Sequence, residues 1–521
     1  MSKSKRDPKN KPLYLDNNGT TQMGSEAIAM LTQWCKIAQN PSSSSKCAEK
    51  SKELIKLAKK ELIKHCGGTG KYTVIYTSGA TESNCFIIRS TVLAYNRIKK
   101  TKPTIIISAI EHESIMSCCK SLEEDNLVKI IYIIPNIEGS IPIASIEKAI
   151  AKNNDICLIS IMFANNEIGT INNVKEIGAL AHQHEIPFHV DAVQGFGKYK
   201  INLIKNNIDA LSASFHKFNG PKGLGLLFIN NDLISGYGLQ GQINGTQQNS
   251  LRGGTENVPA IASSVVALKN TFNSRGEKNR KMLKMRNAII KGLKDAYPIG
   301  EYADYVKRDI HNSVDFNGID YDPAIGGFEE IDDSEFIEPV NDVEIVILGP
   351  PQNQITRILP NTILLSVAKN IHDKYGTFCN SKLRQDLDKK GVVVSVGSAC
   401  NSSSDHASHV VNAIKAPSVI KRGIIRVSLG DENTPQDVEK FLSIFKSCVN
   451  KQIATKRSST VKSTKPKSVS TKSSSTRSSI LKSTKPKSVS IKSRSARSST
   501  AKSAKTAKSV RINPKVKVIN Q

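Results

Sequence analysis

Short apolar runs rich in β-branched residues alternate with helical patterns in the first half of the chain. Segments such as SIEKAIAK and KEIGALAHQHE, which separate these runs, have the spacing of amphipathic helices. Because strands that alternate with helices form a mostly parallel sheet covered on both faces, we expect an α/β fold with ligand-binding groups just after strands. The runs are YTVIYT at 72–77, PTIIISAI at 103–110, VKIIYIIP at 128–135, DICLISIMF at 155–163, PFHVDAV at 187–193, ALSASF at 210–215 and GLGLLFI at 223–229.

A second region follows a long helical pattern. Apolar positions continue at helical spacing through 258–272 and 280–297, and residues 315–344 then hold eleven Asp or Glu and no Lys or Arg. Such an acidic stretch indicates an inserted surface segment. We therefore expect a basic arm at 1–12, a large domain at 13–265, a smaller α+β domain at 266–450 with an acidic insertion at about 301–357, and a tail at 451–521.

The tail is repetitive and basic. KSTKPKSVS occurs at 462–470 and again at 482–490, and residues 451–521 carry +20 of the chain's formal charge of +28. A segment with so few large apolar residues cannot bury enough surface to fold alone, so we predict a disordered tail. It has no Trp, Phe or Tyr to stack on bases, so we expect non-specific nucleic acid binding through 452–521, or docking on the acidic segment.

The ten cysteines and ten histidines lack the spacing of a metal site. No C-x-x-C pair occurs, so we expect neither a zinc site nor a cluster. No apolar run of membrane-spanning length and no signal peptide is evident. We expect an intracellular, cytoplasmic protein with reduced thiols and no membrane association. A nuclear location through the basic tail is the alternative.

Lys217 lies in SASFHKFNGPKGLG, between two apolar strand patterns. A lysine between core elements is costly unless it has a function, and burial lowers the pKa of an amine until it can form a Schiff base with an aldehyde cofactor. The turn at 78–81 opens a helix after a strand, which suits a phosphate, and Asp191 ends another strand, which suits a protonated pyridine nitrogen. Each feature alone fits an ordinary turn or cap, but together they indicate a pyridoxal phosphate site.

An ordered set of motifs resembles the NifS/IscS-like cysteine desulfurases, in the class V aminotransferase group of fold-type I pyridoxal phosphate enzymes. The resemblance extends from about Tyr14 to Cys448, apart from the acidic insertion. It implies a large domain with a mostly parallel sheet and a smaller α+β domain, and it implies a homodimer. The motifs are YLDNNGTT, NPSS, TSGATESN, EHES, NNEIGT, HVDAVQ, SFHK, RGGTENV, GSACNS and IIRVSLG.

The resemblance also implies a role for each matching residue. Lys217 would carry the cofactor as a Schiff base, and His112 would stack on its ring. Asp191 would pair with the ring nitrogen, and Arg426 would bind the carboxylate of the amino-acid substrate. The further cofactor contacts would be Ala80, Thr81, Ser214, His216 and, across the subunit interface, Thr255 for the phosphate, with Asn166 and Gln194 for the ring's phenolic oxygen side.

The resemblance implies that Cys400 determines which reaction takes place at the site. The stretch SVGSACNSSSDHASHV around it is small and polar, as expected for a mobile thiol carrier. The matching cysteine in the family accepts sulfur from L-cysteine as a persulfide, alanine is released, and the sulfur passes to an acceptor protein such as an iron–sulfur scaffold. The sequence leaves open a selenocysteine lyase or an aminotransferase of the same group, and a degenerate pyridoxal phosphate scaffold that carries a nucleic-acid-binding tail.

Overall fold

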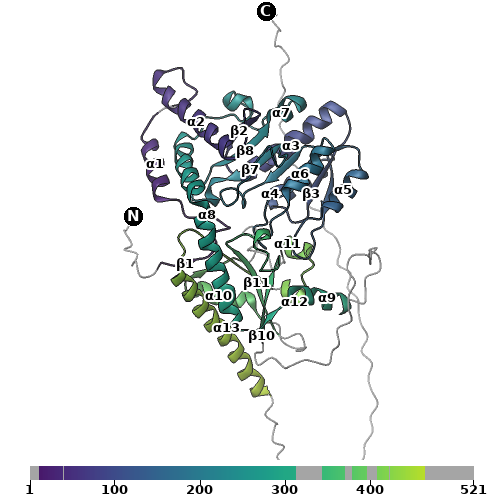
Figure 1. The fold of residues 1–521 in the computed structure, drawn as a ribbon, viewed down its shortest axis with the longest axis vertical. Helices are drawn as coiled ribbons and strands as arrows, with labels where there is room; N and C mark the ends of the chain where they lie inside the picture. Colours follow the sequence, from purple (N-terminus) through teal and green to yellow (C-terminus); the bar gives the residue numbers. More distant parts are fainter. Residues whose placement is uncertain are drawn as a thin grey trace, which may run out of the picture. The chain divides into compact units, whose positions relative to one another are not determined.

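A computed structural model of the chain describes residues 11–38, 40–312, 343–369, 378–395, 408–421 and 423–463. The described residues up to Ser463 belong to one compact unit, which contains a seven-stranded and a four-stranded sheet (Figure 1). Within the described part of the chain, no helix is both long and apolar enough to cross a membrane.

The seven-stranded sheet forms from the apolar runs found in the sequence. β8 is antiparallel to both of its neighbours, while every other adjacent pair is parallel, which confirms the mostly parallel α/β sheet. The runs are continuously apolar because both faces of the sheet are buried. In spatial order the strands are β2 (Tyr72–Thr77), β8 (Gly225–Asn230), β7 (Ala210–Ser214), β6 (Phe188–Asp191), β5 (Ile156–Ser160), β3 (Thr104–Ser108) and β4 (Lys129–Ile133).

Helices cover both faces of this sheet. Ile105 and Ile107 of β3 pack in one apolar cluster, whereas Ile106 points to the other, as the two-residue period of a strand requires. The first cluster includes α3 (Ala80–Lys99), α4 (Glu113–Glu124) and α7 (Asn231–Tyr237). The second includes α2 (Glu49–His65), α5 (Ile143–Ala151), α6 (Val174–Gln183) and the first half of α8 (Val258–Lys294), on which α1 (Ser25–Cys35) also packs.

The four-stranded sheet consists of β13 (Ile425–Ser428), β11 (Thr362–Lys369), β10 (Val343–Leu348) and β9 (Ile299–Gly300), in that order. The second half of α8, α10 (Asn380–Lys389) and α13 (Pro435–Ser463) pack in a cluster with this sheet. Its other side chains join the cluster of the large sheet, together with residues of α9 (Tyr302–Asn312), α11 (His409–Ala413) and α12 (Ser418–Lys421). One of the apolar clusters therefore contains side chains of both sheets.

The described residues correct several expected boundaries. The division at 265 and 266 falls inside α8, which begins at the Asn257 cap and runs from one sheet to the other (Figure 1). β1 (Leu13–Tyr14) pairs with β12 (Val392–Val393), so this part of the expected large domain belongs to the other core.

α9 and β10 lie within the range expected for the acidic insertion, and α13 extends into the range expected for the tail. The range 301–357 is too wide for an insertion, because α9 packs in the core and β10 is an inner strand that pairs with β9 and β11. The expected tail starts too early, since α13 continues to Ser463. Residues 313–342 and 464–521 lie outside the described residues, so the predicted disorder of the tail stays a prediction.

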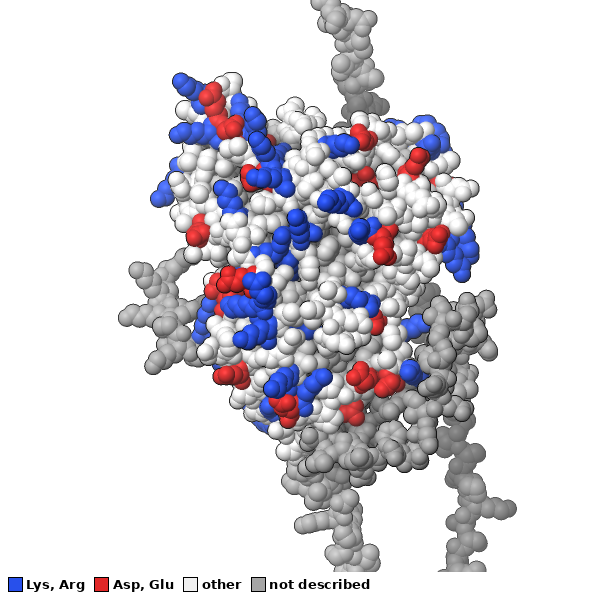
Figure 2. All heavy atoms as spheres, in the orientation of Figure 1, with Lys and Arg blue, Asp and Glu red and all other residues white. Residues whose placement is uncertain are grey.

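Exposed lysines follow one side of α2. Lys52, Lys56, Lys60 and Lys64 recur every fourth residue, and all four are exposed. Figure 2 shows basic side chains gathered at the upper left, over α2. Like charges spaced four residues apart repel on a helix. The buried row of Ile55, Ala58 and Leu62, rather than the charge pattern, therefore holds α2 in place.

Glu111 is a fully buried carboxylic acid in the turn after β3. Its Oε1 accepts hydrogen bonds from the Ser108 hydroxyl at 2.5 Å and from the Met162 N–H at 2.9 Å. Burial raises the pKa of Glu111 to about 8, although these hydrogen bonds act in the opposite direction. At neutral pH the folded protein therefore holds this side chain protonated.

We predict that Glu111→Gln makes the protein less sensitive to alkaline pH. The folded-state pKa of Glu111 lies above its ordinary value of 4.5, so the unfolded chain binds fewer protons up to about pH 8. Stability then falls as pH rises through this window, by up to about 1.4 kcal/mol per pH unit. Urea unfolding at pH 5 and pH 8 should show that the variant loses less stability than the wild type, whereas Glu124→Gln, at an exposed position, should follow the wild type. Equal losses in all three proteins would contradict this account.

Candidate active site

A cavity of about 430 Å³ lies where the strands of the large sheet end, beside Arg426 of β13. Its walls come from the segments that follow β2, β3, β5, β6 and β7, as expected for a parallel sheet. Ten of the residues predicted from the sequence line it. They are Ala80, Thr81, His112, Asn166, Asp191, Gln194, Ser214, His216, Lys217 and Arg426.

Two predicted residues are not among those that line the cavity. Thr255 is exposed on the segment before α8. Cys400 falls in 396–407, outside the described residues, so its position relative to the cavity is untested.

The N-terminus of α3 forms one end of the cavity. Gly79 is the N-cap of α3 and has no side chain to accept a hydrogen bond from the first turn. The first-turn N–H groups at Ala80 and Thr81 therefore lie at the cavity without a side-chain cap. β8 can approach this turn because a Cβ on Gly225 would stand 2.4 Å from the carbonyl carbon of Gly79. Uncapped N–H groups at a helix N-terminus favour an anion such as phosphate.

Lys217 ends the short turn η3 (Phe215–Lys217) that directly follows β7. Its Nζ donates hydrogen bonds to the carbonyl oxygens of Asn18 at 2.6 Å and Gly19 at 2.8 Å. The amine thus projects into the cavity region from the strand side and is oriented by backbone of the N-terminal segment.

Asp191 is the last residue of β6 and is held from two sides. Its Oδ2 accepts a hydrogen bond from the Asn84 amide at 2.9 Å, and its Oδ1 accepts one from the Val193 N–H at 2.9 Å. The Asn84 amide also donates to the Ser114 hydroxyl at 2.9 Å. A carboxylate that is 5% exposed and bonded in this way has little freedom to turn. It presents a fixed negative group in the cavity wall.

His112 caps α4 with its ring, because Nδ1 accepts a hydrogen bond from the Ser114 N–H at 3.1 Å. Burial lowers the pKa of His112, while the charge of Asp191 opposes this shift. Burial also lowers the pKa of His216 to about 4, and the nearby Lys217 lowers it further. Both imidazoles are therefore neutral at pH 7, so they add no positive charge beside Lys217.

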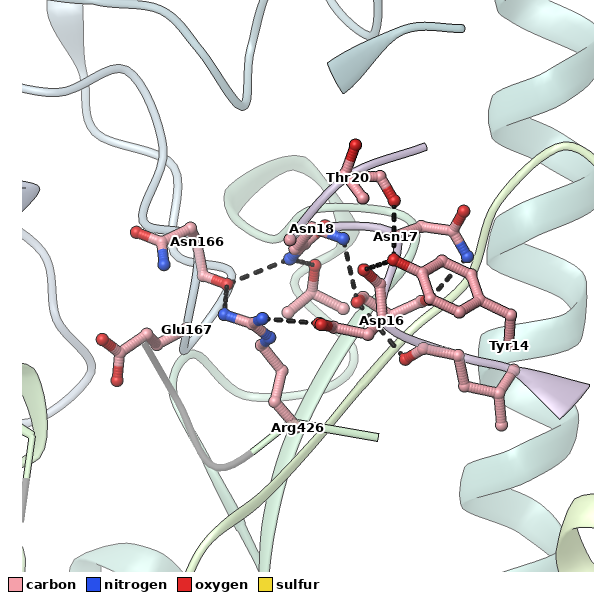
Figure 3. A network of polar contacts seen from close by, with 12 residues as sticks. Tyr14, Asp16, Asn17, Asn18, Thr20, Asn166, Glu167 and Arg426 are labelled. Carbon is pink, nitrogen blue, oxygen red and sulfur yellow. Dashed lines mark hydrogen bonds and ion pairs between the residues drawn. The ribbon is translucent and has the colours of Figure 1, made fainter. Parts of the chain in front are cut away.

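Arg426 is 1% exposed and is held by the N-terminal segment (Figure 3). Its Nη2 forms an ion pair with Asp16 Oδ1 at 2.6 Å, and its Nη1 donates to the carbonyl oxygen of Asn166 at 3.1 Å. Its buried Nε has no hydrogen-bond partner among the described residues. A buried donor without a partner is costly, so the bonds of Nη1 and Nη2 are what hold this guanidinium in place.

Asn18 and Arg426 both bond to the carbonyl oxygen of Asn166 (Figure 3). The carbonyl oxygen of Asn18 accepts hydrogen bonds from Lys217 and from the Gln194 amide at 3.1 Å. Its side-chain amide donates to the carbonyl oxygen of Asn166 at 3.0 Å and to the hydroxyl of Thr362 at 2.8 Å. One buried residue therefore bonds to segments of both sheets.

The sequence interpretation missed the residues that orient the predicted ones. Asn84 lies four residues after Ala80, on the same side of α3, and that spacing was a usable signal. Asp16 and Asn18 lie in the YLDNNGTT motif, but their partners are more than 140 residues away in the sequence. No local pattern reports such pairings.

The donor set of the cavity fits pyridoxal phosphate. It combines uncapped N–H groups at one end, a lysine amine, and a buried carboxylate with room beside it. Ser214 and His216 line the same cavity as the N-terminus of α3, and His112 lies by Asp191. An anionic group, an aldehyde and a basic ring nitrogen would each meet a complementary group.

Comparison with known proteins gives the same assignment. The profile of the aminotransferase class-V family matches residues 13–324. The cysteine desulfurase IscS of Methanosarcina thermophila is 33% identical over 443 residues, which cover 85% of this chain and 93% of the relative.

Two solved structures are similar as well. The NifS-like protein of Rickettsia africae superposes with a TM-score of 0.65 and 26% identity over 84% of this chain and 99% of its own. SspA in complex with cysteine superposes with a TM-score of 0.57 and 26% identity over 80% of this chain and 98% of its own. The chain therefore belongs to the class-V aminotransferase family, among its NifS/IscS-like cysteine desulfurases.

Proposed function

We propose that the chain converts L-cysteine to L-alanine with pyridoxal phosphate and takes up the sulfur as a persulfide on Cys400, for transfer to an acceptor. The observation that carries this proposal is the single cavity in which Lys217, Asp191 and Arg426 meet the N-terminus of α3. An amine, a ring-nitrogen partner and a carboxylate-binding group are the parts that amino-acid chemistry on pyridoxal phosphate needs.

The cofactor, when bound, supplies an electron sink for the bonds around the substrate's α-carbon. Lys217 would hold it and afterwards move a proton at that carbon, a task that suits an amine freed from its attachment. Asp191 would keep the ring nitrogen protonated, because its negative charge is fixed by Asn84 and Val193. Ala80, Thr81, Ser214 and His216 would bind the phosphate, and His112 would cover the ring.

Arg426 would orient the substrate through its carboxylate. A guanidinium offers paired N–H donors that match two carboxylate oxygens. Asp16 and the carbonyl of Asn166 hold Nη2 and Nη1. Asp16 does not line the cavity, so it supports Arg426 from behind rather than competing for the substrate. The ion pair thus fixes the direction in which Arg426 meets its ligand.

Cys400 would accept the sulfur atom of the substrate. Its thiolate would attack the sulfur of the bound cysteine, so that a persulfide forms on Cys400 and the remaining three-carbon amino acid leaves as alanine. An acceptor protein, such as an iron–sulfur scaffold, would then take the sulfur. The alternatives are selenocysteine cleavage and amino transfer at the same site, which need the same cofactor groups but not a sulfur-accepting thiol.

A homodimer would complete the site through Thr255. Arg252, three residues earlier, forms an ion pair with Glu82 of α3 at 2.9 Å. This bond attaches the RGGT segment beside the phosphate end of the cavity while Thr255 stays exposed. An exposed residue in that position suits contact with a second copy, whose phosphate it would reach. Nucleic acid binding through 452–521 remains a separate proposal from the sequence.

We predict that the purified protein with pyridoxal phosphate and a thiol reductant releases alanine and sulfide in equal amounts from L-cysteine. Lys217→Ala should lower alanine release by about a thousandfold or more, because it removes both the attachment point and the proton-transfer group. Cys400→Ala should abolish sulfide release but retain bound cofactor, and Cys35→Ala, at an exposed cysteine, should match the wild type. Sulfide release that survives in Cys400→Ala would exclude the persulfide role, and amino transfer to a 2-oxo acid without sulfide would favour the aminotransferase.

We predict that Arg426→Lys raises the KM for L-cysteine at least tenfold, about 1.4 kcal/mol, because a lysine cannot pair with both carboxylate oxygens. The kcat should change less, since the reacting groups remain. The matched control is Arg357→Lys, at the ion pair with Glu138 away from the cavity. Steady-state kinetics separates the two parameters. A KM that stays at the wild-type value in Arg426→Lys would remove Arg426 from substrate binding.

A further inference from the structure

Two cysteines face each other across the contact between α3 and α4. Cys85 lies in the second turn of α3 and is half-buried, whereas Cys118 on α4 is 6% exposed. Each thiol shifts the pKa of the other, so the two sulfur atoms lie close together. The Cys85 Sγ also lies 3.7 Å from the carbonyl oxygen of Ser114, one helical turn before Cys118. Neither cysteine lines the cofactor cavity.

The surroundings of the pair make Cys85 the nucleophile. The hydrogen bond with Cys118 lowers the pKa of the Cys85 thiol to about 7; burial opposes this shift, Arg89 adds to it, and Glu82 opposes it. The same hydrogen bond raises the pKa of the Cys118 thiol, and burial raises it further. Near neutral pH one sulfur is therefore partly thiolate while its neighbour stays protonated.

The groups that pack around Cys85 do not reverse the difference between the thiol pKa values of Cys85 and Cys118. α4 contributes the thiol of Cys118 and the carbonyl oxygen of Ser114. The segment after α7 contributes the Gln242 amide, which bonds to the carbonyl oxygen of Cys85 at 2.6 Å and carries no charge. Arg89 and Glu82, both on α3, are the charged groups that shift the thiol pKa of Cys85.

The other described cysteines that are buried differ from Cys85. Burial raises the thiol pKa of Cys66, Cys119 and Cys157, which keeps these side chains protonated and inert. Cys119 is the neighbour of Cys118 in the sequence, yet it is fully buried on a different side of α4. Among these cysteines, a reactive thiol beside a second thiol that can form a disulfide with it is therefore found at Cys85 on α3 and Cys118 on α4.

We propose that Cys85 and Cys118 are a thiol–disulfide pair, a modification site that takes low-molecular-weight disulfides such as oxidised glutathione. The Cys85 thiolate attacks one sulfur of the small disulfide, whose S–S bond breaks and releases one thiolate. The Cys118 thiol then gives up its proton and attacks Cys85 Sγ, which forms the intramolecular disulfide and releases the second thiolate. Two electrons pass from the pair to the small disulfide, which leaves as two thiols.

The position of the pair connects it to the cofactor site. Cys85 directly follows Asn84, whose amide bonds to Asp191 and to Ser114. A disulfide would join α3 to α4 beside this amide, where the two helices otherwise meet through apolar contacts and hydrogen bonds. The inference does not depend on the proposed reaction, because thiol exchange needs neither Lys217 nor Cys400.

The test treats the purified protein, with pyridoxal phosphate bound, with oxidised glutathione, then blocks free thiols and digests it without reduction. Mass spectrometry of the wild type should find the Cys85 peptide linked to the peptide that contains Cys118 and Cys119. Cys118→Ala should lose the link and keep one glutathione on Cys85, whereas the matched control Cys119→Ala should retain the link. Circular dichroism and cofactor absorbance check that each variant is folded.

Alkylation by iodoacetamide provides a second readout that needs no disulfide. The rate at Cys85 should rise with a midpoint near pH 7 in the wild type. In Cys118→Ala the midpoint should move up by about one unit or more, since the hydrogen bond to the thiolate is gone. A wild type in which the exposed Cys35 gains glutathione while Cys85 and Cys118 stay unlinked would overturn the proposal. So would a link that survives in Cys118→Ala or is lost in Cys119→Ala.

Discussion

The buried hydrogen bonds of Asn18 are the constraint on which the cavity depends. The chain leaves β1, which pairs with β12 beside the small sheet, and passes between the two sheets before α1. On this path the carbonyl of Asn18 accepts from Lys217 and Gln194, and its amide donates to Asn166 and Thr362. A buried amide that loses its partners costs about 1–3 kcal/mol for each unsatisfied group. The segment therefore fixes how residues of the two sheets meet.

Burial sets the proton states around this network. The pKa of His216 falls to about 4, that of Glu111 rises to about 8, and burial lowers that of His189 to about 3. His189 lies between the hydroxyls of Ser160 at 2.8 Å and Ser212 at 2.9 Å, so its neutral ring has partners on both sides. The interior at the strand ends is thus built largely from neutral polar groups. In such surroundings the charge of a bound anionic cofactor interacts strongly with the helix end and with Lys217.

Ten of the residues expected from the sequence line one cavity because they lie at the ends of strands or just beyond them. Asp191 ends β6 and Lys217 ends the turn that follows β7, and parallel strands bring their carboxyl ends to one edge. What the sequence could not predict depends on tertiary pairing. The ion pair of Asp16 with Arg426 joins positions 410 residues apart, and no periodicity records it. A domain division near residue 265 depends on the same kind of information, since α8 has apolar positions in two different clusters along one uninterrupted helix.

The proposed function requires that Lys217 is the lysine that carries the cofactor. Lys198 is the alternative lysine for this role. Burial lowers the pKa of Lys198 to about 8, so this amine is also partly neutral near neutral pH. Its Nζ, however, bonds to the carbonyl and the side chain of Gln194, and it does not line the cavity.

The most direct measurement is borohydride reduction of the protein with pyridoxal phosphate, followed by peptide mapping of the pyridoxyl group. The account predicts the label on Lys217 and none on Lys198 or on Lys222, which also lines the cavity. A label on either of the other two lysines, or no stable label at all, would contradict it.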